Sequence, residues 1–203
     1  MKSSFRTLTL GSALAIALSA SLMGCSKESA TQAADPAAAA AAAPIAAAES
    51  YDILAKEGRG FTVGSMMAAN TVYVLFDPQC PHCGHLWQAS VPLQNRVKFV
   101  WMPIAFINAK SAPQGAALLG AANPVEAMNA HEASILAGSG GTAASADVPA
   151  DLATAIQKNT ELLNRMGVAS VPHIVTKNPA TGQVITKTGA LDTPQLAAFL
   201  GMN

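Results

Sequence analysis

The chain has 203 residues, which suits one domain of ordinary size once the low-complexity ends are set aside. Its formal net charge is zero, and only 12% of its residues are charged. The sequence has no cluster of lysine and arginine, so its composition argues against nucleic acid as a partner.

The N-terminal segment, residues 1–24, predicts a lipoprotein signal peptide. Lys2 and Arg6 supply its positive end, and residues 8–20 form an apolar stretch too short to cross a bilayer as a helix. The Leu-Met-Gly-Cys that follows resembles the lipobox of bacterial lipoproteins. This resemblance implies that Cys25 receives a lipid and becomes the mature N-terminus. The alternative is a plain secretory signal with a stray cysteine, but the Gly-Cys pair stands where the apolar stretch ends.

The cysteines agree with an exported protein. Export places the chain in an oxidising envelope compartment, the periplasm. Of the three cysteines, one is assigned to the lipid and two belong to a Cys-x-x-Cys motif, so none is left for a structural disulfide. Read by lipoprotein sorting rules, Ser26 slightly favours the outer membrane as the site of the anchor.

A flexible linker is expected at residues 25–48. It contains seven consecutive alanines between Pro36 and Pro44 and few large apolar side chains, so it cannot bury a core. Seven alanines are also too few to hold a helix alone. The folded domain is therefore predicted at residues 49–203.

The first elements of this domain lead to the Cys-x-x-Cys motif. A helix is expected at residues 49–58 and a short strand at 61–63. The apolar run 72–76 is rich in β-branched and aromatic residues and predicts a strand buried on both faces. Asp77 and Pro78 end this strand, and a helical pattern begins after Cys80.

A redox-active dithiol is the favoured interpretation of the motif. Cys80 opens the helix, where unpaired N–H groups and the helix dipole stabilise a thiolate, and Cys83 lies one turn further on. A zinc site needs four ligands, and only His82 and His85 stand near this one pair. Haem attachment needs a histidine where Gly84 stands, an iron–sulfur cluster needs more cysteines, and a structural disulfide this short stabilises little. We therefore expect no metal and no cofactor.

The rest of the chain predicts a second strand, a helical insertion and a return to β structure. After a strand at 97–101, helical spacing recurs through an insertion at about residues 108–166. Two strands joined by a turn follow, and Asp192 or Thr193 caps a last helix. The expected elements of this part are helices at 111–120, 124–137 and 151–166 and strands at 174–176 and 184–186.

This order of elements resembles an α/β thioredoxin-like fold with a helical insertion between the active-site βαβ unit and the cis-proline hairpin. Within that fold, residues 49–203 resemble periplasmic thiol:disulfide interchange proteins of the DsbG/DsbC type. The segments that carry the resemblance are FDPQCPHCGHLW, VKFVWMPIAF, AALL and MGVASVPHIV. The resemblance implies that Cys80 is the attacking thiolate, that Cys83 is the resolving thiol, and that Val171-Pro172 is a cis-proline loop against the two sulfurs.

The residues around the cysteines are expected to bind substrate and tune the thiols. A cis Val171-Pro172 bond leaves the backbone of Val171 free to pair with an extended substrate strand. Pro81 and His82 make the motif Cys-Pro-His-Cys, which resembles that of the oxidase DsbA, and an imidazole there lowers the pKa of Cys80. The surrounding chain resembles DsbG, so the direction of exchange stays open.

Two departures from the DsbG/DsbC pattern affect the prediction. Only a linker and a short helix precede the catalytic domain, where dimeric relatives carry a dimerisation domain, so a monomer is expected. The strand before Cys80 has no acid, and Thr71 stands about where thioredoxins bury one. A buried carboxylate that accepts protons is therefore not visible in the sequence.

The favoured function is a thiol:disulfide oxidoreductase that acts on exported proteins through a mixed disulfide. Its expected partners are the thiols and disulfides of exported proteins, an envelope redox partner protein and the membrane that holds the lipid. One alternative is a membrane-tethered chaperone or binding module with a secondary redox role. A third possibility is copper delivery by Cys80, Cys83 and a histidine.

Other polar and apolar side chains receive weaker assignments. His131 is expected on the surface of the insertion. His85 is left open between the rim of the site and an exposed helix face, and His173 between the site and the core. Trp87 and Trp101 are predicted core residues. The Met66-Met67 pair is expected to pack against apolar neighbours.

Overall fold

The computed structural model describes residues 43–69 and 71–202. Residues 1–42, which include the predicted signal peptide, Cys25 and most of the linker, lie outside the described residues. Among the helices of the described ranges, none is long and apolar enough to cross a membrane.

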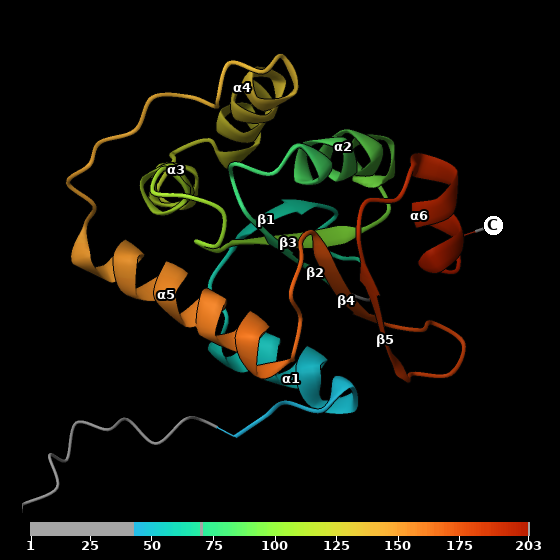
Figure 1. The fold of residues 1–203 in the computed structure, drawn as a ribbon. Helices are drawn as coiled ribbons and strands as arrows, with labels where there is room; N and C mark the ends of the chain where they lie inside the picture. Colours follow the sequence, from blue (N-terminus) through green and yellow to red (C-terminus); the bar gives the residue numbers. More distant parts are fainter. Residues whose placement is uncertain (1–42, 70, 203) are drawn as a thin grey trace, which may run out of the picture. The chain divides into compact units, whose positions relative to one another are not determined.

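Within this part of the chain, a mixed sheet is combined with helices that lie on both of its faces (Figure 1). The strands are β1 (Phe61–Gly64), β2 (Thr71–Phe76), β3 (Lys98–Pro103), β4 (His173–Lys177) and β5 (Val184–Thr188). The helices are α1 (Ala47–Glu57), α2 (Pro81–Ser90), η1 (Val91–Leu93), α3 (Ser111–Leu119), α4 (Pro124–Leu136), α5 (Ala150–Arg165) and α6 (Thr193–Phe199). The predicted α/β fold with a helical insertion between β3 and β4 is thus confirmed.

The central strand of the sheet is the one that precedes the cysteine motif. The strand order is β1-β3-β2-β4-β5, and β2 pairs parallel with β3 and antiparallel with β4. Every residue of β2 after Thr71 is buried, as its unbroken apolar run predicts. The helices α2 and α6 cover one face of the sheet, and α1 and α5 cover the other (Figure 1). The carboxyl end of β2 leads through a short turn to the start of α2.

The prediction that both tryptophans are core residues is confirmed. Trp87 of α2 and Trp101 of β3 are 2% and 0% exposed, and their rings meet edge to face at 5.1 Å. The expectation that Met66 and Met67 pack against apolar neighbours is wrong, because their side chains are 64% and 92% exposed. They belong to the turn between β1 and β2, which carries them away from the sheet.

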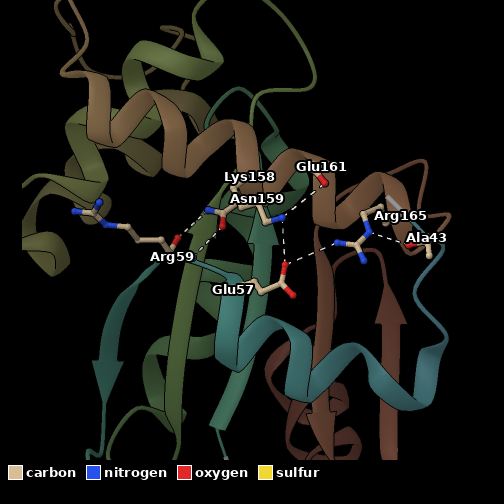
Figure 2. Close-up of polar contacts among 7 residues, drawn as sticks. All are labelled: Ala43, Glu57, Arg59, Lys158, Asn159, Glu161 and Arg165. Atoms are coloured by element: carbon tan, nitrogen blue, oxygen red, sulfur yellow. Dashed lines mark hydrogen bonds and ion pairs between the residues drawn. The ribbon is translucent and has the colours of Figure 1, made fainter. Parts of the chain in front are cut away.

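A buried asparagine fixes the last helix of the insertion to the rest of the domain (Figure 2). Asn159 is fully buried in α5 and accepts a hydrogen bond from the Arg59 N–H at 3.0 Å. Its amide group donates to the carbonyls of Arg59 and Pro103 at 2.8 and 2.9 Å. Removing this side chain would take a partner from one buried and two partly buried backbone groups, so Asn159 holds α5 against the end of β3.

Ion pairs surround this contact but contribute less. Lys158 and Arg165 of α5 lie 3.1 and 3.8 Å from the carboxylate of Glu57 at the end of α1, and the Arg165 guanidinium also donates to the Ala43 carbonyl (Figure 2). These side chains are partly exposed, and such pairs are worth ~1 kcal/mol or less. They orient α1 and the chain before it along α5.

Candidate active site

The two cysteines occupy different positions in the first turn of α2. Cys80 is the residue before the helix, with extended backbone angles, and Pro81 takes the first helical position, where its missing N–H costs nothing. Cys83 lies one turn inside, and its N–H donates to the Cys80 carbonyl at 3.0 Å. Both are free thiols, with Cys80 5% and Cys83 0% exposed.

The pKa of Cys80 is lowered to about 6. The largest cause is a hydrogen bond from the Cys83 thiol, which outweighs the opposing effect of burial; the N–H groups of Cys83 and His82 add to it. The charge of the His82 imidazole also lowers the pKa of Cys80 and is the smallest of these causes. Cys80 is therefore mainly thiolate at neutral pH, and its stabilisation comes more from Cys83 than from the imidazole.

The pKa of Cys83 moves the opposite way. Burial raises it well above its ordinary value, and the neighbouring Cys80 and Glu132 raise it further. At neutral pH the pair is thus a thiolate at the open end of the helix beside a buried thiol. This division agrees with an attacking Cys80 and a resolving Cys83.

The predicted proline loop lies against the first sulfur. The Val171–Pro172 peptide bond is cis, and the Val171 carbonyl oxygen is 3.7 Å from Cys80 Sγ. His173, the next residue, is 4% exposed and its Nδ1 lies 2.8 Å from the Thr188 hydroxyl of β5. Burial lowers the pKa of His173 to about 4, so the ring is neutral. His173 therefore joins two strands.

The two histidines of α2 are on the surface. His82 and His85 are both exposed on α2, with ring centroids 6.4 Å apart. His85 thus lies on an exposed helix face beside His82. In the described residues, no group of three or more histidine, cysteine or acidic side chains is arranged to hold a metal ion.

Asp77, which the sequence marked only as the end of a strand, organises the loops around the site. Its carboxyl group is fully buried and accepts hydrogen bonds from two directions. The donors are the N–H groups of Gln79, Phe106 and Ile107 and the hydroxyl of Ser111, at 2.7–2.8 Å. Asp77 thereby joins the turn before Cys80 to the segment between β3 and α3.

His131 is buried, so its assignment to the surface is wrong. The ring is 0% exposed because α4 packs against α2 and covers the turn before Cys80. Its Nδ1 accepts the Thr142 N–H at 3.2 Å, and its Nε2 therefore donates to the Pro78 carbonyl at 2.7 Å. Burial lowers the pKa of His131, which agrees with a neutral ring.

The neighbouring Glu132 is a buried acid that the sequence analysis missed. It is 1% exposed, and neither carboxyl oxygen has a hydrogen-bond partner among the described residues. Burial above all, then Cys80 and Asp77, raises its pKa to about 8. Its position four residues after Met128 and three before Ile135, both buried, was the available signal, because that spacing places it on the apolar face of α4.

Fold and site together define a thioredoxin-like protein. The family model of the thioredoxin-like domain matches residues 67–202, and the chain belongs to this family. Thiol:disulfide interchange protein DsbG of Pseudomonas aeruginosa is 33% identical over 141 residues, which are 68% of this chain and 54% of that protein. DsbG of Escherichia coli is 29% identical over 117 residues, 55% of this chain and 45% of that protein. The chain thus spans about half the length of these curated relatives.

Solved structures show the same fold at lower identity. The catalytic domain of Proteus mirabilis ScsC is 20% identical with a TM-score of 0.59, covering 76% of this chain and 94% of that one. DsbA2 of Pseudomonas aeruginosa is 18% identical with a TM-score of 0.52, covering 68% of this chain and 90% of that one.

Proposed function

We propose that this protein is a thiol:disulfide oxidoreductase that acts on exported proteins through a mixed disulfide at Cys80. The observation that carries the proposal is the opposite displacement of two pKa values within one motif, which provides an attacking thiolate and a protected thiol. The likeness to DsbG supports the same reaction.

The reaction follows from this division. In the oxidising direction, a substrate thiolate attacks Cys80 Sγ of the Cys80–Cys83 disulfide, and Cys83 leaves. A second substrate thiolate then attacks the substrate sulfur of the mixed disulfide, so that the substrate disulfide forms and Cys80 departs as a thiolate. An envelope redox partner protein then reoxidises the pair. In the reducing direction, Cys80 attacks a substrate disulfide and Cys83 resolves the intermediate.

Substrate recognition is assigned to the cis-proline loop, together with the tuning residues Pro81 and His82. Val171 precedes the proline, and its carbonyl borders the Cys80 sulfur, so an extended substrate strand that pairs with this backbone places its own sulfur in line. Substrates of this kind are unfolded or partly folded chains with accessible cysteines.

The reaction is placed in the periplasm, where disulfide exchange with exported chains takes place. The predicted signal peptide and the Leu-Met-Gly-Cys that resembles a lipobox support an anchor through a lipid on Cys25, with the outer membrane slightly favoured by Ser26. Mass spectrometry of the mature N-terminal peptide tests this: an acylated Cys25 is expected, and a free Cys25 within a chain cleaved elsewhere contradicts it. The mature protein is proposed to be a monomer, which sedimentation at micromolar concentration tests.

The experiment that tests the activity uses the mature protein and a reduced, unfolded substrate with two cysteines. Wild type is expected to form the substrate disulfide, and Cys83→Ser to accumulate a mixed disulfide visible on a non-reducing gel. Cys80→Ser is expected to do neither. Formation of the mixed disulfide by Cys80→Ser, or its absence in Cys83→Ser, would overturn the assignment.

A further inference from the structure

The carboxyl group of Glu132 lies against the first turn of α2. A Cβ atom added to Gly84 would lie 2.7 Å from Glu132 Oε2 and 3.1 Å from Leu136 Cγ. A larger residue at position 84 would have to displace this carboxyl group, so glycine allows its close approach at the residue that follows Cys83. The side chain comes from α4 of the insertion, whereas the strand before Cys80 carries no acid.

The surroundings of Glu132 provide nothing that stabilises a negative charge. Cys80 and Asp77 both raise its pKa, and no ion pair involves Glu132 in the described residues. His131, the adjacent ring on α4, is bonded to Pro78 and Thr142 instead. His82 and His85 are exposed on α2. A buried acid without partners among the described residues reduces stability, and reactivity is one explanation for such a group.

Proton transfer at Cys83 would be a reactive role of this kind, because the reaction of this buried thiol requires a proton to move inside the protein. Its thiol is fully buried, so water cannot exchange the proton freely, and burial disfavours a lingering thiolate. Glu132 lies close enough to raise the pKa of Cys83 across the first turn of α2. A general acid–base works best when its pKa lies near the working pH, and that of Glu132 is about 8.

We propose that Glu132 exchanges the proton of Cys83 during thiol–disulfide exchange, directly or through one water molecule. The inference rests on the proposed oxidoreductase function. In the oxidising direction the Cys80–Cys83 bond breaks, its electron pair goes to Cys83 Sγ, and the Glu132 carboxyl group gives that sulfur its proton. In the reducing direction the Glu132 carboxylate takes the proton from Cys83, whose sulfur then attacks Cys80 Sγ and releases the substrate thiolate.

The two steps separate in a reaction with an aromatic disulfide reagent that releases a coloured thiolate. Cys80 of the reduced mature protein attacks the reagent first, and Cys83 then resolves the adduct and releases a second coloured thiolate. Glu132→Gln keeps the size of the side chain but cannot take a proton. It is expected to slow the second phase by about a hundredfold, the usual range for loss of general acid–base catalysis, and the first phase by less than about threefold.

Matched controls keep this test specific. Glu126→Gln changes an exposed glutamate of the same helix and should leave both phases unchanged. Glu132→Asp should restore part of the second phase. Wild type should show a second phase that accelerates as the carboxyl group ionises, whereas Glu132→Gln should follow only the ionisation of the Cys83 thiol.

Several outcomes would overturn the proposal. A second phase in Glu132→Gln with the rate and pH profile of wild type removes Glu132 from proton transfer. Absence of the first phase in wild type instead removes the oxidoreductase function, so the two failures are distinguishable. If Glu132→Gln does not fold, carbon-13 NMR of the wild-type carboxyl group decides. Titration near pH 8 in the reduced protein supports the proposal, and an acid ionised throughout pH 5–9 contradicts it.

Discussion

Asp77 and Glu132 are both buried carboxyl groups near the same cysteine pair, yet their surroundings are opposite. Asp77 accepts four hydrogen bonds and joins the turn before Cys80 to the segment between β3 and α3. Glu132 accepts none from the described residues, and its carboxyl group occupies space that a side chain at Gly84 would need. Almost all buried polar groups in native proteins are hydrogen-bonded. The contrast therefore separates a carboxyl group that builds the site from one that is available to react.

The largest expected effect tests the structural half of this comparison. Asp77→Ala leaves three partly buried N–H groups and the buried hydroxyl of Ser111 without their acceptor, and a fully buried group without a partner costs ~1–3 kcal/mol before relaxation. We expect a loss of ~3–5 kcal/mol in the free energy of unfolding. Urea denaturation followed by circular dichroism measures it. An effect below ~1 kcal/mol would show that Asp77 does not hold these loops.

The second prediction concerns the pH dependence that Glu132 imposes on stability. Because its pKa rises from 4.5 to about 8 on folding, the unfolded chain loses this proton at a lower pH than the folded chain. Between these values the folded state binds more protons, so stability due to Glu132 falls as pH rises, by up to ~1.4 kcal/mol per pH unit.

Glu132→Gln removes this dependence, so its stability relative to wild type should increase from pH 5 to pH 7. The comparison with wild type matters because other groups act in the opposite sense. Lowered pKa values of Cys80 and His173 make stability rise with pH, and both proteins share them. Urea unfolding at each pH measures the difference. For Glu126→Gln, the free energy of unfolding relative to wild type should not change with pH. If the same were found for Glu132→Gln, the raised pKa of Glu132 would be contradicted.

A third prediction tests the contact between Glu132 and α2. Gly84→Ala places a methyl group 2.7 Å from the carboxyl oxygen, and overpacking of this kind costs ~1–3 kcal/mol. Glu132→Ala in the same chain should relieve part of the loss, which a double-mutant cycle measures. Additive effects of the two substitutions would mean that the side chains do not meet.

How far the site could be predicted from sequence depends on the distance over which its parts are joined. Cys80, Cys83 and the strand–helix order are local features, and the pattern of β2 and α2 indicates them directly. The cis bond at Val171 followed from the resemblance to a known family. Each of these features lies within a short stretch whose residues determine its own geometry.

Contacts of the insertion were not predictable in this way. The apolar face of α4 carries His131 and Glu132, and spacing alone does not reveal which element covers it. Burial arises because α4 packs on α2, a contact between segments about 45 residues apart along the chain. His131 was therefore wrongly placed on the surface. Glu132, the buried acid near the cysteines, lies on a helix of the insertion and was not predicted.

The last and smallest effect concerns the thiolate itself. The Cys83 thiol is the first cause of the lowered pKa of Cys80, and the His82 charge is the last. Cys83→Ala is therefore expected to raise the pKa of Cys80 clearly, and His82→Ala to raise it by less than about one, each pKa unit corresponding to ~1.4 kcal/mol. Alkylation rate against pH gives both values.

The disulfide should respond in proportion. A higher Cys80 pKa makes the reduced form less favourable, so His82→Ala should make the disulfide harder to reduce by less than ~30 mV, the equivalent of one pKa unit for a two-electron couple. Equilibrium with glutathione measures this shift, and His85→Ala on the same exposed helix face serves as its control. If His82→Ala raised the pKa of Cys80 more than Cys83→Ala does, the order of causes would be reversed. The imidazole, instead of the buried thiol, would then be the main group that stabilises the thiolate.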